Sequence, residues 1–234
     1  RNPFLLLFVF SFMGTLLASA QKQGTERIDS LLAELINAKQ DSNKVKLLND
    51  FSYTYRVINP DEGIKYGHHA LQLAEKLNWK KGIAYSNQRL GNNYLNKSDF
   101  QSALKYFQTS LLQFNELKDK SGIAKTLHLI GVVYDYQSYF LKASEYYSAS
   151  LHIFTELEDK NGIATMLMEL GIVNDEQSDF SKALEYYFMS LKVYEEIGNE
   201  SKMGPIYSNI GSVYLRENNL AKALDYKLQA YKIF

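Results

Sequence analysis

A forty-residue repeat runs through most of the sequence and limits its fold more than any other feature. A glycine, an alanine, a bulky apolar residue and a tyrosine each recur at this interval. These positions are Gly91, Gly131, Gly171 and Gly211; Ala103, Ala143, Ala183 and Ala223; Phe100, Phe140, Phe180 and Leu220; and Tyr106, Tyr146, Tyr186 and Tyr226. Repeats of this length are typical of chains whose units bury their apolar faces only against neighbouring units. The sequence therefore predicts a solenoid.

Within each repeat the apolar spacing is that of two helices. In the second copy one apolar face runs from Ile83 to Tyr94 and another from Phe100 to Phe114, each with steps of three and four residues. We expect helices of about 17–19 residues joined by tight polar turns. Ser98 and Gln101 have the spacing of a capping box at the start of the second helix. Asn59-Pro60 reads as a cap followed by proline at the first helical position.

The recurring glycines lie in the middle of the first helix of each repeat. Glycine there costs about 1 kcal/mol relative to alanine, so its repetition indicates a close approach of another group. We expect the recurring alanine of the second helix, such as Ala103, to be that group. An earlier, divergent copy has Phe51 at the glycine position and Gly63 at the alanine position.

The same residues resemble the tetratricopeptide repeat (TPR) signature. It stands here as Leu90-Gly91 with Tyr94, then Ala103 with Phe107 and Ser110. The usual unit is shorter than this one, at about 34 residues. The resemblance implies an all-α solenoid, a right-handed superhelix of antiparallel helix hairpins. It covers residues 41–234 with about five repeats, of which the first is divergent and the last is truncated. In the fourth repeat Asn174 replaces the aromatic residue.

Residues 1–20 have the pattern of a secretory signal peptide. An apolar run at residues 4–17 follows Arg1 and precedes Ala18-Ser19-Ala20, which predicts cleavage before Gln21. The run is shorter than the roughly 20 residues that span a bilayer; an uncleaved anchor is the alternative. We therefore expect an exported, periplasmic protein, with a leading helix in residues 21–40 and no membrane contact by the mature region.

Both ends of the sequence are expected to be truncations, since it lacks an initiating Met and stops within an amphipathic pattern. The signal peptide and the long repeats are similar to exported TPR regions of bacterial membrane-bound regulators. That resemblance implies a transmembrane helix after Phe234, followed by a histidine kinase, a nucleotide cyclase or a LuxR-type DNA-binding domain. A sensor region of such a regulator is the alternative to a free-standing scaffold.

The composition argues against several functions. Lys and Arg total 26 and Asp and Glu total 26, so nothing indicates a nucleic-acid partner. The sequence has no cysteine, and it contains no G-x-S-x-G, Walker or G-x-G-x-x-G motif. His68 and His69 point about 100° apart on a helix and cannot share one metal ion. We expect no catalytic site, no metal and no cofactor.

The TPR resemblance places a partner-binding groove on the first helix of each repeat. The predicted groove residues are Tyr85, Gln88, Asn92, Leu95 and Asn96; Lys125, His128, Val132, Asp135 and Tyr136; Thr165, Met168, Ile172, Asp175 and Glu176; and Ser208, Ser212 and Arg216. Their mixed chemistry suits a protein or peptide, either an amphipathic helix or an extended segment. A clamp for a peptide carboxylate is disfavoured, since Leu48 and Leu129 occupy two of its positions.

Two features of this surface have competing interpretations. Asp175 and Glu176 are expected to face Asp135, where close carboxylates either bind a cation and shift a pKa or are simply solvated. The 18 tyrosines suggest stacking on sugars or bases. Because most tyrosines fall at core positions of the repeat, packing is the better explanation.

Overall fold

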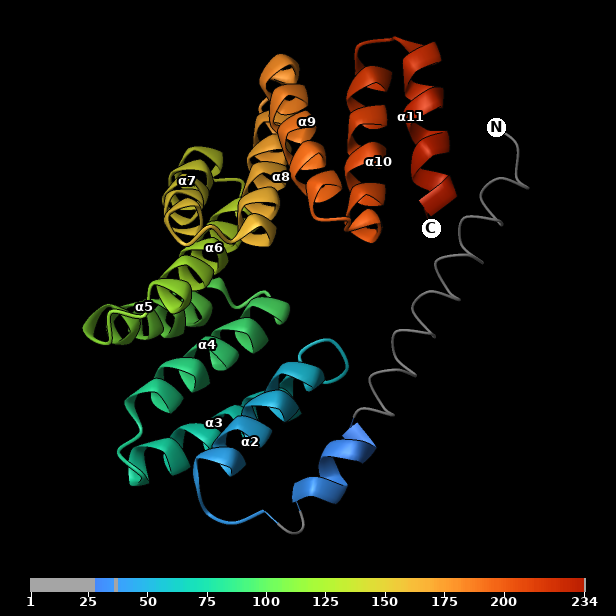
Figure 1. Ribbon diagram of the computed structural model, residues 1–234. Helices are drawn as coiled ribbons and strands as arrows, with labels where there is room; N and C mark the ends of the chain where they lie inside the picture. The colour runs from blue at the N-terminus through green and yellow to red at the C-terminus, as the bar shows by residue number, and fades with distance from the viewer. Residues whose placement is uncertain (1–27, 36–37, 234) are drawn as a thin grey trace. The chain divides into compact units, whose positions relative to one another are not determined.

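The computed structural model describes residues 28–35 and 38–233, and all of its regular elements are α-helices (Figure 1). The predicted signal peptide lies outside the described residues. The chain divides after Gln113 into two compact units, which are described separately here. A short helix at 28–35 is the described part of the predicted leading helix.

Ten further helices follow in the described chain, and consecutive helices pack as hairpins. They are α2 (Ser42–Tyr55), α3 (Pro60–Lys76), α4 (Lys80–Asn96), α5 (Phe100–Glu116), α6 (Lys120–Tyr136), α7 (Phe140–Glu156), α8 (Lys160–Glu176), α9 (Phe180–Glu196), α10 (Glu200–Arg216) and α11 (Leu220–Ile233). In unit 2, α6 packs on α7, α8 on α9 and α10 on α11, while α7 contacts α8 and α9 contacts α10. The predicted all-α solenoid of helix hairpins is confirmed.

Helix ends recur at a regular interval because one turn geometry repeats. Each turn from Asn78 to Asn218 contains a residue with positive φ, for example Ser98 at 58° and Ser138 at 60°. The next backbone N–H returns to a carbonyl five residues back, as in Asp99 N to Tyr94 O at 2.9 Å. These are the bonds of a Schellman motif, which closes a helix and reverses the chain within three residues.

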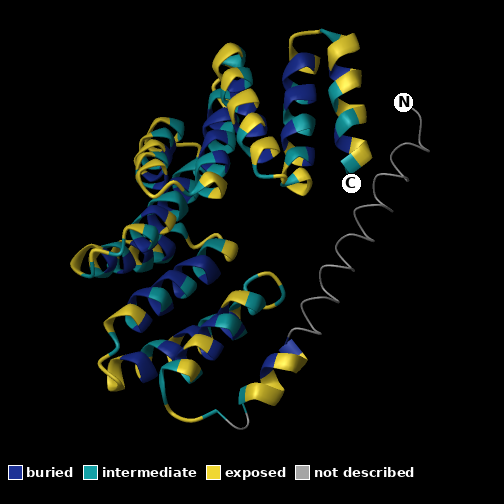
Figure 2. Ribbon diagram, viewed as in Figure 1, coloured by how far each residue is buried: buried dark blue, intermediate teal, exposed yellow. Residues whose placement is uncertain are grey.

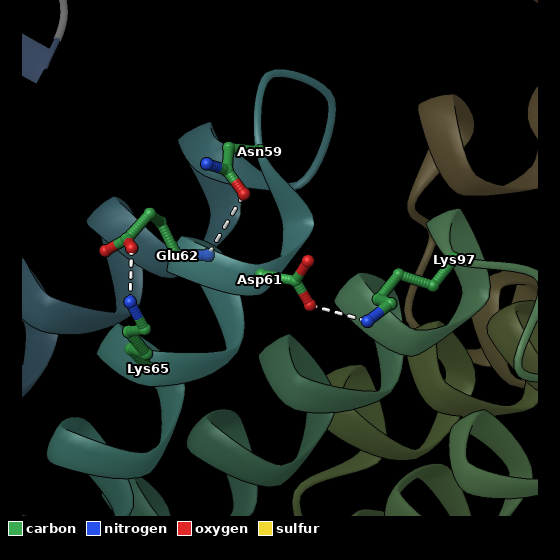
Figure 3. Close-up of polar contacts among 5 residues, drawn as sticks. All are labelled: Asn59, Asp61, Glu62, Lys65 and Lys97. Carbon is green, nitrogen blue, oxygen red and sulfur yellow. Dashed lines mark hydrogen bonds and ion pairs between the residues drawn. The ribbon is translucent and has the colours of Figure 1, made fainter.

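One predicted cap is wrong and another is confirmed. Ser98 does not cap α5, because its left-handed backbone belongs to the preceding turn; Asp99 does so, accepting from Ser102 N at 3.1 Å. Asn59 caps α3 as predicted, and its Oδ1 accepts from Glu62 N at 3.3 Å ahead of Pro60 (Figure 3). Figure 3 also shows the ion pairs of Asp61 with Lys97 and of Glu62 with Lys65.

The recurring glycine makes room first of all for an aromatic ring. A Cβ placed on Gly131 of α6 would lie 2.6 Å from the ring of Tyr147 on α7, and Gly171 has the same relation to Tyr187. Both tyrosines are fully or almost fully buried. In these two hairpins the nearest group is therefore the ring and not the expected alanine. At Gly211, where no ring follows, a Cβ would meet the backbone oxygen of Ala223 at 3.1 Å, which is the contact that we expected.

The recurring serine of the second helix forms a hydrogen bond across the hairpin. Ser150 Oγ donates to Ala124 O at 2.8 Å, and Ser190 Oγ donates to Ala164 O at 2.7 Å. In unit 1, Ser110 Oγ donates to Ala84 O at 2.9 Å. The serine is small, as its position requires, and it also links the second helix to the first turns of its partner.

In the first hairpin of unit 1 the large aromatic side chain comes from the first helix, α2, whereas in later hairpins, such as that of α6 and α7, it comes from the second helix. Phe51 of α2 is fully buried and stacks on Tyr66 of α3, with ring centroids 4.6 Å apart. Gly67 stands where later repeats have Phe107 or Tyr147, and a Cβ there would meet Leu90 Cδ2 at 2.7 Å. The helix at 28–35 packs against α2 through buried Ile28 and Leu31. The divergent first copy is thus a hairpin with inverted packing.

Burial follows the position of each helix in its hairpin (Figure 2). The first helices α6, α8 and α10 each bury six or seven residues, whereas α11 buries only Ala223 and Ala230. Tyrosines fill the hairpins in stacked pairs, such as Tyr134 with Tyr146 at 5.4 Å between centroids. Packing rather than ligand stacking accounts for these rings.

Candidate partner-binding surface

In unit 1 the predicted groove residues lie on α4 and are largely covered. Gln88 and Asn92 are buried, with only 4% and 8% of their surfaces exposed, whereas Asn96 is exposed. Asn96 Nδ2 donates to Asn92 O at 2.9 Å. A first-helix position therefore does not by itself make a side chain accessible, and unit 1 offers little of the polar surface that we expected from α4.

Two concavities in unit 1 were not anticipated from the sequence. The larger, of about 570 Å³, lies among the helix at 28–35, α2 and α3, and its lining includes Lys44, Lys76 and His69 above Leu48 and Leu73. The smaller, of about 100 Å³, is lined by Lys46, Asn49, Asp50, Trp79, Tyr85 and Arg89. Apart from the recurring tyrosine at Tyr66, most of their lining residues differ from those at equivalent positions of later repeats, so the repeat pattern did not indicate either concavity.

In unit 2 the predicted groove residues lie on α6, α8 and α10, the first helices of three successive hairpins. Four of them are exposed: Lys125, Tyr136, Glu176 and Arg216. Eight are partly buried: His128, Val132, Asp135, Thr165, Met168, Ile172, Ser208 and Ser212. Asp175 is buried, with 6% of its surface exposed. The prediction thus identified a surface of mixed accessibility.

Asp175 of α8 is paired with Arg216 of α10. Arg216 Nη1 lies 3.0 Å from Asp175 Oδ1, and the same nitrogen donates to Asp175 O at 3.3 Å. Burial raises the pKa of Asp175, and the guanidinium opposes this rise. The next hairpin therefore supplies the positively charged partner of Asp175.

Asp135 of α6 occupies the equivalent position one repeat earlier, and there the next hairpin supplies an acid. Glu176 stands at the position that Arg216 holds in the following repeat. Burial raises the pKa of the Asp135 carboxyl from 3.8 to about 6, and the charges of Glu169 and Glu176 add to the rise. The charge of Glu176 therefore acts on Asp135, and that Glu176 faces Asp135 stays a prediction, whereas Asp175 pairs with Arg216.

Glu169 and His128 extend this cluster. His128 Nε2 lies 3.5 Å from Glu169 Oε1, and both side chains are mostly covered, with 25% and 17% exposed. The ring of His128 lies 5.8 Å from that of Tyr147. Burial raises the pKa of the Tyr147 hydroxyl, with smaller contributions from Glu169 and Asp135. Glu169 was not predicted; its only signal was its disagreement with the other repeats, which have Arg89, Leu129 and Asn209 at this position.

Other predicted groove residues bond within their own hairpins. Lys227 Nζ of α11 donates to Ser208 Oγ at 3.0 Å and to Ser212 Oγ at 2.8 Å. Thr165 Oγ1 lies 2.9 Å from the hydroxyl oxygen of Tyr194. These hydroxyls stabilise the helix pairs, which leaves the carboxylates as the distinctive chemistry of the surface.

The described part of the chain shows no group of three or more His, Asp or Glu side chains arranged to hold a metal ion. His152 lies 3.6 Å from Glu156, one turn away on α7, and both side chains are exposed. Among the residues described, no helix is long and apolar enough to cross a membrane.

Comparison with known proteins agrees with this architecture. Residues 163–234 match a family model described as Tetratricopeptide repeat. No curated protein matches the sequence significantly. Several solved structures share the fold at low identity. BtubC from P. vanneervenii is similar with a TM-score of 0.72 and 15% identity, over 93% of this chain and 90% of that one.

Two further structural matches are to a complex and to a sensor protein. A Rap protein complexed with Competence and Sporulation Factor has a TM-score of 0.71 and 12% identity, over 96% of this chain and 72% of that one. A STAND protein with a tetratricopeptide repeat sensor, from Pyrococcus horikoshii, has a TM-score of 0.71 and 18% identity. This chain covers 87% of its own length there and 32% of the STAND protein. The chain therefore has the fold of tetratricopeptide-repeat proteins, and its last part, residues 163–234, matches the tetratricopeptide-repeat family model.

Proposed function

We propose that this protein is a non-catalytic binding module that holds a protein or peptide on the surface formed by α6, α8 and α10. The observation that carries the proposal is the cluster of Asp135, Glu169 and Glu176, three carboxylates gathered on the first helices of two successive hairpins. Like charges placed close together repel each other and cost free energy unless a group of opposite charge binds them. Exposed Tyr136 adjoins them at the end of α6 and adds contact area for a partner.

The solved relatives support binding as the role of such a fold. One similar chain was crystallised in complex with Competence and Sporulation Factor, and another is described as carrying a repeat sensor. Stacked hairpins offer long rows of side chains rather than one deep pocket, which suits an extended or helical segment. No nucleophile, base and orienting group occur together in the sequence motifs, so we propose binding without catalysis.

A library experiment tests the proposal. The protein is exposed to a random peptide library, and enriched sequences are measured by fluorescence anisotropy against the parent and against Glu176→Arg. Glu185→Arg is the matched control, since Glu185 is an exposed glutamate on α9, the second helix of the same hairpin. We expect Glu176→Arg to change the affinity at least tenfold and Glu185→Arg to leave it unchanged. Enrichment of no sequence, or equal effects of both variants, would overturn the proposal.

A second candidate is the sensory region of an exported, membrane-bound regulator. The likeness to a STAND protein with a tetratricopeptide repeat sensor, of which this chain covers 32%, favours it, together with the signal-peptide pattern of residues 1–20. This reading retains the binding surface and adds an effector domain after residue 234, preceded by a membrane helix. Reading the gene beyond Phe234 tests the effector, and fractionation of expressing cells tests export to the periplasm.

A further inference from the structure

The acidic group, defined as the carboxylates of Asp135, Glu169 and Glu176, has no lysine or arginine partner within the described structure. No Lys or Arg side chain of residues 38–233 forms an ion pair with any of the three. Only His128 approaches, at 3.5 Å from Glu169. A carboxylate that is half covered normally has a cation or several donors beside it. The group therefore has an excess of negative charge.

A buried hydroxyl lies near the same group. Tyr147 is fully buried, and its hydroxyl has no hydrogen-bond partner in the described structure. Its ring lies 5.8 Å from that of His128, which in turn lies 3.5 Å from Glu169, and the charges of Glu169 and Asp135 act on its hydroxyl. A buried hydroxyl without a partner costs about 1–3 kcal/mol. The surroundings of the acidic group thus contain an unsatisfied polar side chain.

The next repeat shows which chemistry suits such a place. There the equivalent aspartate, Asp175, has the guanidinium of Arg216 at 3.0 Å. The two aspartates stand at the same position of successive hairpins, so the backbone around them is alike. The difference is that α10 supplies arginine where α8 supplies Glu176. A guanidinium brought from outside would give Asp135 the kind of partner that Asp175 already has.

We propose that the acidic group receives a lysine or arginine side chain of the bound partner, an inference that rests on the proposed function. A guanidinium fits better than a metal ion, since the described residues show no group of three acidic or histidine side chains that could hold a metal, whereas the forked donors of a guanidinium can serve more than one carboxylate. Partly buried Val132 and Ile172 lie on the same two helices and can contact the aliphatic stem of such a side chain. The ring of Tyr136 can contact its charged end.

The test uses a positional-scanning library of acetylated, amidated hexapeptides, with binding to the folded protein read at each position. For the parent protein we expect one position to favour Arg or Lys at least tenfold over citrulline or norleucine. In Glu176→Arg, which supplies the cation from within, this preference should disappear while preferences at other positions persist. Glu185→Arg, the matched control, should keep it. Thermal melts followed by circular dichroism establish that each variant is folded.

The outcomes separate this inference from the proposed function. A library in which no position shows any preference contradicts the binding module itself. Clear preferences without a basic position, or a basic preference that survives both Glu176→Arg and Asp135→Asn, overturn the basic-residue site and leave the binding module standing. Loss of the basic preference in both variants supports the site.

Discussion

Replacement of Asp135 by asparagine should stabilise the protein at neutral pH. Burial and the nearby Glu169 and Glu176 raise the pKa of Asp135 from 3.8 to about 6. The rise of about two pH units, at about 1.4 kcal/mol each, sets an upper bound near 3 kcal/mol. Partial exposure to solvent screens the interaction, so we expect about 1–2 kcal/mol. Asparagine has nearly the same shape and carries no charge.

The sign of the pH dependence follows from proton binding. The folded state holds the Asp135 proton more tightly than the unfolded state, so this carboxyl contributes a penalty that grows as pH rises from about 4 to about 6. Well below pH 4 the carboxyl is protonated in both states and the penalty is absent. Well above pH 6 the penalty is complete. The stability advantage of Asp135→Asn over the parent should therefore be largest at pH 7.5 and much smaller at pH 4.

Urea unfolding followed by circular dichroism at pH 4.0 and 7.5 measures this difference. Asp179→Asn serves as the control with the opposite sign. Hydrogen bonds from Lys182 lower the pKa of Asp179, so its ionised form stabilises the folded state above about pH 4, and this stability is lost as pH falls through the folded pKa. An Asp135→Asn variant that gains equally at both pH values, or that loses stability at pH 7.5, would refute the reasoning.

Three further predictions concern the packing of the repeat, and urea unfolding checks each. Gly131→Ala should lower the free energy of unfolding by about 1–2 kcal/mol, since the added methyl meets an aromatic ring at 2.6 Å. Gly211→Ala should cost less, because its methyl meets Lys227 Cγ at 3.0 Å and the backbone oxygen of Ala223 at 3.1 Å, tight contacts that the better helix propensity of alanine partly offsets. Ser150→Ala should lower it by about 1 kcal/mol because the buried hydrogen bond across its hairpin is lost. Asn93→Val should cost about 2 kcal/mol, because Asn93 Nδ2 donates to both oxygens of Ser52 at 3.1 and 2.9 Å. Adding Ser52→Ala should recover part of that loss, and strictly additive effects would contradict this last prediction.

The fold was predictable because its two determinants are periodic in the sequence. The spacing of apolar residues predicts which face of each helix is buried, and the forty-residue period predicts that the helix hairpins stack on one another. A single sequence is therefore enough to predict hairpins of two similar helices. The partner of the recurring glycine was not predictable in this way. Spacing shows that something approaches Gly131, but only the rotamer of Tyr147 decides that a ring rather than an alanine does so.

Turn chemistry explains the error at Ser98. The serine and a glutamine three residues later have the spacing of a capping box, but the chain must first reverse, and that reversal uses Ser98 in a left-handed conformation. Asp99 then caps the helix. The regular spacing between turns was the signal that could have fixed this register, since Asp119, Asp159 and Asp179 cap their helices in the same way.

The candidate site was predictable by helix but not by side chain. A first-helix position indicates which residues approach the surface, yet neighbouring helices cover part of it, so Gln88 and Asp175 are buried while Tyr136 is exposed. Ion pairing between hairpins is also invisible to helical spacing. The residue that faces Asp175 belongs to the next repeat, and only a repeat register applied across hairpins brings Arg216 to it.

Because each position of the repeat recurs in nearly the same backbone environment, a residue can be compared with its equivalents in the other repeats of the same chain. Departures from the repeat then divide into two kinds. Asn93 departs from Val133, Val173 and Val213, and Ser52 compensates it within the fold. Glu176 stands at a position that varies between repeats, where Asn96, Tyr136 and Arg216 are its equivalents, and it leaves the charge beside Asp135 without a compensating cation. A departure that the fold balances internally serves stability. The uncompensated charge beside Asp135 is instead the feature on which the proposed binding site rests.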